Sequence, residues 1–393
     1  MLVFVAIALA VYGLINFYIG RRGAQALSSV PAARAVFLVL FVGLALMFPL
    51  GRILMGFAKG GLTSLLVEIG TFHLAVMLYG FMAVFAVDLA RLVNAAVPFL
   101  PRALAGEGAR SGPAVFAAVA GAVVLTVAAG AWNATRLRTV DLDIRIPAGS
   151  GTVERLTVVV ASDLHLGTLV GPARLEKVVE RINALEPDVV LFAGDIVDET
   201  VTEEIEAKLS GIMRRLRAPS GIFTCLGNHE SYSGLERNVA CLRSCGITVL
   251  QDEAAEVDGA FVLAGRRDPS SLKIREKRLS IGGILAASAA RTDLPLVILD
   301  HQPIHLEEAE QAGAALQISG HTHDGQMFPI GLINGLIYEL NWGSLRKGGT
   351  AYYVTSGAGT WGPPVRIGSR AEVVRIRLHF DRTGGERSSR SGH

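Results

Sequence analysis

"ISGHTHDGQMFP", residues 318–329, ends an apolar run with a glycine and then two histidines, His321 and His323, one residue apart. Such a pair is weak evidence alone, because neighbouring histidines are often only polar loop residues. The meaning of this stretch therefore depends on whether other segments of the chain supply partners.

Four other apolar runs also end at polar side chains that can bind a metal. They are "LTVVVASD" (156–163), "DVVLFAGD" (188–195), "GIFTCLGN" (221–228) and "PLVILDHQP" (295–303). Short runs rich in Val and Ile, without alternation, are typical of strands buried on both faces. The segment 173–187 between the first two runs has apolar residues at helical spacing and predicts a crossover helix. Residues 139–148 alternate apolar and polar side chains and predict an edge strand. Strand, helix and strand together predict an α/β sandwich.

Metal-competent side chains follow each predicted buried strand. Because ligands of open α/β sheets bind beyond the carboxyl ends of the strands, we expect these side chains to converge on one crevice if the strands lie side by side. They are Asp163 and His165, Asp195 and Asp198, Asn228 and His229, His301, and His321 and His323.

The predicted donors are carboxylates, imidazoles and one amide, with no cysteine. That mixture suits Mn²⁺, Fe or Zn²⁺ better than a cysteine-rich structural zinc site. Seven donors exceed the needs of one tetrahedral ion and suit two ions about 3.5–4 Å apart that share a carboxylate. Such a pair favours the hydrolysis of phosphate esters. The seven are Asp163, His165, Asp195, Asn228, His301, His321 and His323.

The order D-x-H, G-D-x-x-D, G-N-H-E, an isolated histidine and G-H-x-H resembles the calcineurin-like metallophosphoesterases, and GHTHDGQ resembles their YkuE-like, membrane-associated bacterial branch. The resemblance implies a four-layer αββα sandwich. It also implies a first metal held by Asp163, His165, Asp195 and His323. Mn²⁺ is the expected ion, with Fe or Zn²⁺ as alternatives. Asp195 would bridge to a second metal completed by Asn228, His301 and His321.

The same resemblance implies catalytic roles for two residues outside the ligand set. His229 matches the histidine that stabilises the transition state or protonates the leaving group. Asp198 would orient a ligand histidine or a bound water, although an aspartate there could also cap the following helix. Glu199 and Asp324 depart from the arginine and glycine common in relatives, and Asp324 adds negative charge near the site. His305 and His379 are interpreted as structural residues.

The first third of the chain is strongly apolar. The 393 residues are 51% hydrophobic and 18% charged, and the apolar excess precedes residue 133. Four stretches, 2–19, 35–57, 69–87 and 114–132, are each close to the roughly 20 residues that cross a bilayer. Within them, His73 is expected to make a helix-packing hydrogen bond, and Asp88 is expected to pair with Arg91 on one helix face.

The distribution of arginines predicts the orientation of these spans. The loops after the first and third spans carry the larger basic set, which the positive-inside rule places in the cytoplasm. The large second half would then face outward from the cell membrane. The net charge of +2 gives no reason to expect a nucleic-acid partner. The larger basic set, in the loops after the first and third spans, consists of Arg21, Arg22, Arg34, Arg91, Arg102 and Arg110.

The sequence therefore predicts a transmembrane domain of four helices (1–133), a linker with a first strand (134–155), a metallophosphoesterase domain (156–380) and a disordered tail (381–393). The predicted function is a membrane-anchored hydrolase of phosphomonoesters or phosphodiesters, with a lipid-linked phosphate or pyrophosphate as one substrate class. A catalytically silent, partner-binding metal domain and a transporter with a regulatory domain are the alternatives. Residues 327–342 are either core or an exposed segment that admits an acyl chain. The thiols of Cys225, Cys241 and Cys245 are expected to be reduced or buried.

Overall fold

A computed structural model describes residues 2–57, 60–105, 111–167, 169–198, 203–271 and 277–381. The chain divides into two compact units, one of Met1–Trp132 with Gly362–Val365 and one of Asn133–Trp361 with Arg366–His393. Apart from Asp381, the predicted tail lies outside the described residues, as do Glu199 and Arg110.

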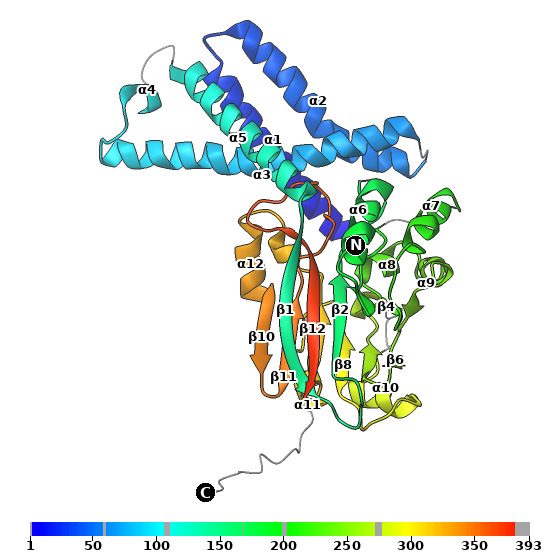
Figure 1. The fold of residues 1–393 in the computed structure, drawn as a ribbon. Coiled ribbons are helices and arrows are strands. Elements are labelled where there is room, and N and C mark those ends of the chain that lie inside the picture. Colours follow the sequence, from blue (N-terminus) through cyan, green and yellow to red (C-terminus); the bar gives the residue numbers. More distant parts are fainter. Residues whose placement is uncertain are drawn as a thin grey trace, which may run out of the picture. The chain divides into compact units, whose positions relative to one another are not determined.

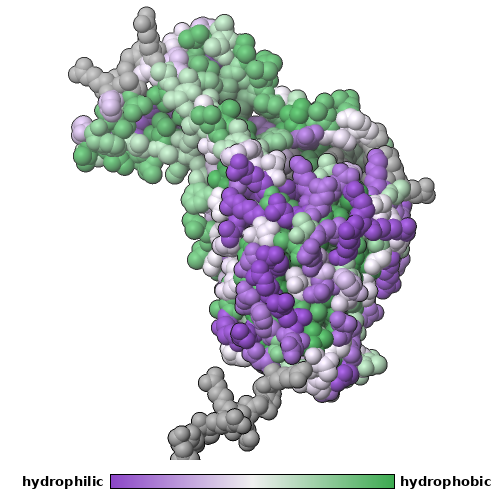
Figure 2. All heavy atoms as spheres, in the orientation of Figure 1, coloured by the Kyte–Doolittle hydropathy of each residue, from purple (hydrophilic) through white to green (hydrophobic). Residues whose placement is uncertain are grey.

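The first unit is helical. Four of its described helices are long and apolar enough to cross a membrane. Three of them contain the whole span predicted for them, whereas the second covers 31–55 and ends two residues before the predicted end at 57. Figure 2 shows mostly hydrophobic side chains over this part, whereas hydrophilic ones gather on the visible face of the α/β part. The elements are α1 (Leu2–Ala26), α2 (Pro31–Met55), α3 (Gly61–Ala96), α4 (Arg102–Ala105) and α5 (Ser111–Thr135).

Polar groups inside the helical unit bond between helices. His73 Nε2 lies 2.8 Å from Asn16 Oδ1, which is the expected packing contact. The predicted pairing of Asp88 with Arg91 is wrong. Arg22 reaches Asp88 from α1 instead, with Nε and a terminal nitrogen each 2.7 Å from Oδ2. Arg91 Nε donates to the carbonyl oxygen of Leu104, because the incoming guanidinium already satisfies the carboxylate.

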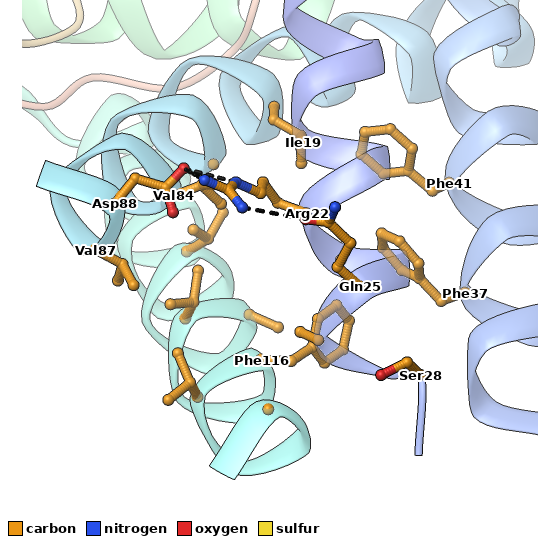
Figure 3. Close-up of a pocket in the computed structure, with 18 of the residues that line it drawn as sticks. Ile19, Arg22, Gln25, Ser28, Phe37, Phe41, Val84, Val87, Asp88 and Phe116 are labelled. Atoms are coloured by element: carbon orange, nitrogen blue, oxygen red, sulfur yellow. Dashed lines mark hydrogen bonds and ion pairs between the residues drawn. The ribbon is translucent and has the colours of Figure 1, made fainter. Parts of the chain in front are cut away.

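The Arg22–Asp88 pair stands at the edge of an apolar cavity of about 610 Å³. Phe37, Phe41 and Phe116 line it together with valines of α3 and α5 (Figure 3). Arg22 donates hydrogen bonds to Asp88 and Gln25. The positive charge of Arg22 is neutralised by the carboxylate of Asp88.

The second unit contains two six-stranded sheets in its described part, ordered β1-β12-β2-β3-β4-β5 and β10-β11-β9-β8-β7-β6. β1 is an edge strand, in agreement with its alternating pattern, and it pairs with β12, which lies between β1 and β2 (Figure 1). The first sheet contains β1 (Leu137–Pro147), β2 (Arg155–Ala161), β3 (Val189–Ala193), β4 (Ile222–Cys225), β5 (Thr248–Val249) and β12 (Ala371–Asp381). The second contains β6 (Glu253–Val257), β7 (Phe261–Gly265), β8 (Leu296–Leu299), β9 (Leu316–Ser319), β10 (Gly343–Lys347) and β11 (Thr350–Val354).

Helices cover the outer face of each sheet. In β2, Val159 packs with the helices of the first sheet, whereas Val158 and Val160 pack against the second sheet. Both faces of this strand are thus buried, which explains its unbroken apolar run. The covering helices are α6 (Pro172–Asn183), α7 (Glu203–Met213) and α9 (Leu235–Ser244) on one side, and α10 (Ile281–Ala287) and α11 (Glu307–Gln311) on the other. Helices, sheet, sheet and helices form the αββα sandwich, so the predicted fold class is confirmed.

Shorter elements complete the described chain. They are the helices α8 (Asn228–Tyr232) and α12 (Ile330–Ile337) and the single turns η1 (Pro269–Ser271) and η2 (His323–Gly325). The thiols of Cys225, Cys241 and Cys245 are free and buried.

Candidate metal centre

A first cluster of ligand atoms gathers beyond β2 and β9. His165 Nε2 and His323 Nε2 lie 2.9 Å apart, and Asp163 Oδ1 is 3.5 Å from His323 Nε2 and 4.0 Å from His165 Nε2. All three residues are buried. Two imidazole nitrogens and a carboxylate oxygen converging at these distances fit a divalent cation.

A second cluster lies beyond β3, β4 and β8. Asn228 Oδ1 is 3.2 Å from His301 Nε2 and 2.9 Å from His321 Nδ1. Asp195 Oδ2 is 3.1 Å from His301 Nε2 and also 3.8 Å from His165 Nε2 of the first cluster. One carboxylate oxygen of Asp195 therefore faces both clusters.

The backbone at these residues is strained. Asp163, His165, Asp195, His321 and His323 all have positive φ, between 49° and 72°. This left-handed conformation costs a residue with a side chain about 1–3 kcal/mol, and it is found mainly at functional sites. Asp163 and His165 of the D-x-H turn both reach the first cluster, whereas His323 of the H-x-H turn reaches the first cluster and His321 the second.

Glycine precedes the ligands because no side chain fits there. A Cβ atom added to Gly320 would lie 2.5 Å from Asp163 Oδ2 and would overlap Ser162 Oγ. The strand that carries His321 can therefore approach Asp163 closely enough for the His321 amide to donate to its carboxylate, at 3.0 Å.

Buried groups behind the ligands hold them in place. The fully buried carboxylate of Glu230 accepts hydrogen bonds from the amides of Asp195, Val197 and Gly227, at 2.8–3.1 Å. His301 Nδ1 donates to the carbonyl oxygen of Ala193 at 2.7 Å, which leaves Nε2 directed at the second cluster. Glu230 therefore links the backbone at Asp195 and Val197 to the G-N-H-E turn through hydrogen bonds.

His229 and Asp198 form a pair beside the first cluster. Asp198 Oδ1 contacts His229 Nδ1 directly and is 3.4 Å from His165 Nδ1. The His229 amide donates to Asp195 Oδ1 at 2.9 Å. Asp198 thus touches both the possible proton donor and a possible metal ligand, the arrangement expected of an orienting group.

Burial and neighbouring charges shift the pKa values of these groups in different directions. Burial acts to raise the pKa of Asp195, but His301, His165 and His229 outweigh it and hold that pKa below its usual value. Burial lowers the pKa of His321 to about 4 and that of His323 well below its usual value. Burial raises the pKa of Asp163. Burial acts to lower the pKa of His301, but Asp195 and Asp163 outweigh it and raise that pKa, so the ligand groups share protons until a cation displaces them.

His229 differs from the two neutral histidines. Burial acts to lower its pKa, but the hydrogen bond to Asp198 and the charge of Asp195 outweigh burial and raise it. A protonated imidazole beside the two clusters can give up a proton.

The sequence patterns missed an arginine behind the first cluster. Arg366 is fully buried, and its guanidinium donates to the carbonyl oxygens of Ser356 and Gly359, both at 2.8 Å, while lying 3.3 Å from His323 Nδ1. Burial lowers the pKa of Arg366 to about 10, so the group stays charged at neutral pH. No motif surrounds Arg366, and only its place in the fold reveals it.

Two exposed aromatic rings were also missed. Trp361 and Tyr232 have ring centroids 6.0 and 5.8 Å from that of His229. Gln326 holds Trp361 through hydrogen bonds to its backbone amide and carbonyl groups. The rings flank the place where a substrate would meet His229.

Three other polar residues considered in the sequence, His305, His379 and Asp324, belong to neither cluster of ligand atoms. His305 is exposed and lies 3.4 Å from Glu307, and His379 Nε2 lies 3.1 Å from Asp143 on the sheet edge. Asp324 accepts a hydrogen bond from Asn341, and burial raises the pKa of its carboxyl group to about 6.

The αββα sandwich thus gathers carboxylates, imidazoles and an amide beyond its strands, in clusters that could hold metal ions. Residues 156–325 match the family model described as calcineurin-like phosphoesterase. The chain belongs to the calcineurin-like phosphoesterase family.

Relatives of known name agree with this membership. The transmembrane protein with metallophosphoesterase domain of Danio rerio is 32% identical over 251 residues, 61% of this chain and 57% of that protein. An uncharacterized metallophosphoesterase of Aquifex aeolicus is 32% identical over 236 residues, 60% of this chain and 87% of that protein. The UDP-2,3-diacylglucosamine pyrophosphatase of Chlamydia muridarum is 32% identical over 123 residues, 31% of this chain and 37% of that protein. The chain thus spans just over half the length of the Danio rerio relative.

Proposed function

We propose that this protein is a metal-dependent hydrolase of phosphomonoesters or phosphodiesters, anchored in the cell membrane by its four apolar helices. The observation that carries the proposal is the convergence of seven ligand side chains from five strand ends on two adjacent clusters. Coincidental loop polarity would not bring these groups together, buried and at ligand spacing. The seven are Asp163, His165, Asp195, Asn228, His301, His321 and His323.

Two divalent cations, Mn²⁺ in preference to Fe or Zn²⁺, fit this donor set. Asp163, His165 and His323 would hold one of them, Asn228, His301 and His321 the other, and Asp195 would serve both. The two ions would neutralise charge on a phosphate ester and activate water at neutral pH. The protein supplies the geometry, because strained turns and buried hydrogen bonds fix each ligand.

His229 is the proposed proton donor to the leaving group. Its imidazole stands beside Asp195 yet is not needed as a ligand, and Asp198 holds Nδ1. With Nδ1 held, Nε2 is left to face the substrate. Asp198 is the proposed orienting residue, since it contacts His229 and His165 together.

A catalytically silent metal domain that binds a partner protein is the second candidate. Scaffolds of that kind arise by loss of ligands, and here every expected ligand is present at the site. The pair of His229 and Asp198 adds a proton donor that mere metal binding does not require. Hydrolysis is therefore favoured.

Removal of metal tests the proposal most directly. The detergent-solubilised full chain should hydrolyse bis-p-nitrophenyl phosphate or p-nitrophenyl phosphate with Mn²⁺, and EDTA should lower the rate at least about 10³-fold, because the ions carry several kcal/mol of the barrier reduction. Added Mn²⁺ should restore the rate, and Mg²⁺ addition serves as the control. A chain that binds Mn²⁺ stoichiometrically but hydrolyses neither ester would support the silent domain instead.

A lipid-linked phosphate or pyrophosphate is the proposed natural substrate class. A hydrolase anchored by four helices meets lipids directly, and one relative is named for cleaving the pyrophosphate of a diacylated sugar nucleotide. That pyrophosphatase activity is known from the name of the relative only. What supports the proposal here is membrane anchoring combined with a phosphate-ester site.

The catalytic unit is proposed to face outward. An alkaline phosphatase reporter fused after His393 should be active in cells, because the basic loops after the first and third spans favour the cytoplasm. The same reporter fused after Pro101, in the loop that follows α3, should be inactive. Fluorescence from green fluorescent protein fused after His393 would contradict this orientation, since that protein does not become fluorescent when exported unfolded.

A further inference from the structure

The helix α12 exposes apolar side chains. Its sequence, IGLINGLI, contains no charged residue, and no charge occurs from Gly325 to Tyr338. Leu336 is 89% exposed, and the other members of the set are between 47% and 68% exposed. We call this set, Phe328, Leu332, Ile333, Leu336 and Ile337, the α12 surface.

The polarity of α12 is reversed relative to that of a helix on a soluble domain. Such a helix buries its apolar side chains and turns polar ones to water. In α12 the side chain of Asn334, its only polar one, bonds inward, where Nδ2 donates to the carbonyl oxygen of Thr322 at 3.0 Å. The apolar side chains of the α12 surface face outward, so core packing does not explain this part of the run 327–342, whereas Met327 is buried and Leu340 packs against the core. Figure 2 shows hydrophobic colouring at the left edge of the α/β part, where Figure 1 draws α12.

The α12 surface is coupled to the metal ligands. Thr322, which accepts from Asn334, lies between His321 and His323, and its hydroxyl donates to the carbonyl oxygen of Asn341 at 2.6 Å. A Cβ added to Gly325 would collide with the backbone of Gly331 at the start of α12. The helix therefore cannot move far without moving the histidine turn.

We propose that the α12 surface docks into the apolar edge of a lipid bilayer. The four helices of membrane-crossing length keep a bilayer within reach of every copy of the chain. A patch of this kind covers a few hundred Å². A stable dimer buries about 800 Å² per partner, so a second copy fits less well. An uncharged helix with large aliphatic side chains is apolar, as lipid acyl chains are, and can be buried among them.

Docking would hold the metal centre at the depth of lipid phosphate groups. Because α12 follows the histidine turn directly, a lipid phosphate could reach the site while its acyl chains stay in the bilayer. This consequence rests on the proposed function. Docking itself does not, and it is tested without measuring hydrolysis.

The experiment uses full-length protein reconstituted into phosphatidylcholine vesicles. Leu336→Cys is labelled with the environment-sensitive fluorophore NBD, and the native thiols do not interfere because all three are buried. Glu253→Cys, at an exposed position of β6, is the matched control. Vesicles containing brominated acyl chains should quench the label at 336 several-fold more than the label at 253, and its emission should be blue-shifted.

Equal quenching of the two labels would overturn the proposal. So would a blue shift at 336 that brominated lipid does not quench, together with disulfide cross-linking between copies of the unlabelled Leu336→Cys variant under oxidising conditions, because that outcome identifies a second copy as the occupant. Circular dichroism checks that each variant is folded, and Ile333→Cys replaces Leu336→Cys if the latter fails this check. Loss of quenching with intact hydrolysis, or the reverse, separates docking from the proposed activity.

Discussion

Asp195→Asn is expected to abolish hydrolysis, lowering kcat/KM by at least about 10³-fold, or roughly 4 kcal/mol of transition-state stabilisation. Asp195 is the residue whose one oxygen faces both clusters, 3.8 Å from His165 Nε2 and 3.1 Å from His301 Nε2. Asparagine keeps the shape and can still accept the His229 amide bond through Oδ1. It removes the negative charge that two adjacent cations must share, and so both affinities should fall.

Bound Mn²⁺ per chain, measured by elemental analysis after equilibrium dialysis, separates loss of metal from loss of folding. Asp258→Asn is the matched control, because Asp258 lies in an exposed turn with positive φ that asparagine also tolerates. The control should retain two ions and full turnover. If Asp195→Asn retained both ions and full turnover, the shared-carboxylate assignment would be wrong.

The ligand positions were predictable because each one is marked locally in the sequence. A buried strand reads as a short aliphatic run, and the donors follow directly behind it, as in "VVLFAGD" before Asp195 and "IFTCLG" before Asn228. Convergence then follows from the common direction of parallel strands. The turn that carries Asp163 and His165 has positive φ at both residues, a backbone conformation that the sequence pattern did not indicate.

Assignment of the strands to sheets was not predictable from these runs. β8 and β9 lie in the second sheet, whereas β2, β3 and β4 lie in the first. Strands buried on both faces carry no alternation that shows which sheet they join. Convergence still occurs because the two sheets pack face to face and end at the same side. The αββα arrangement could be expected only through the family resemblance.

Contacts between residues distant in sequence also lay beyond prediction. Arg366 meets His323 across 43 residues, and Asp88 meets Arg22 across 66. In each case the local pattern suggested nothing or suggested the wrong neighbour, because a charged side chain pairs with whatever the fold brings to it. The outward face of α12 was ambiguous for a related reason, since an apolar run looks the same whether protein or lipid covers it.

His229→Ala is expected to lower kcat with bis-p-nitrophenyl phosphate by about 10²–10⁴-fold, the usual contribution of a positioned proton donor. The effect should fall on kcat rather than on metal content, because seven other side chains complete the two proposed metal sites, although His229 also lies within ligand distance of His165 and Asp195. Asp198 holds its Nδ1, so Asp198→Asn should give a smaller loss of the same kind through misorientation of the ring.

The leaving group distinguishes proton donation from general electrostatic stabilisation by His229. p-Nitrophenolate leaves without a proton far more readily than an alkoxide, so the defect of His229→Ala should grow when bis-p-nitrophenyl phosphate is replaced by a dialkyl phosphate diester, which can expel only an alkoxide and whose hydrolysis is followed by release of the alcohol. His305→Ala, which alters an exposed histidine remote from both clusters, should behave as wild type on every ester. If the His229→Ala defect were the same for good and poor leaving groups, His229 would act on the charge of the transition state and not on the departing oxygen.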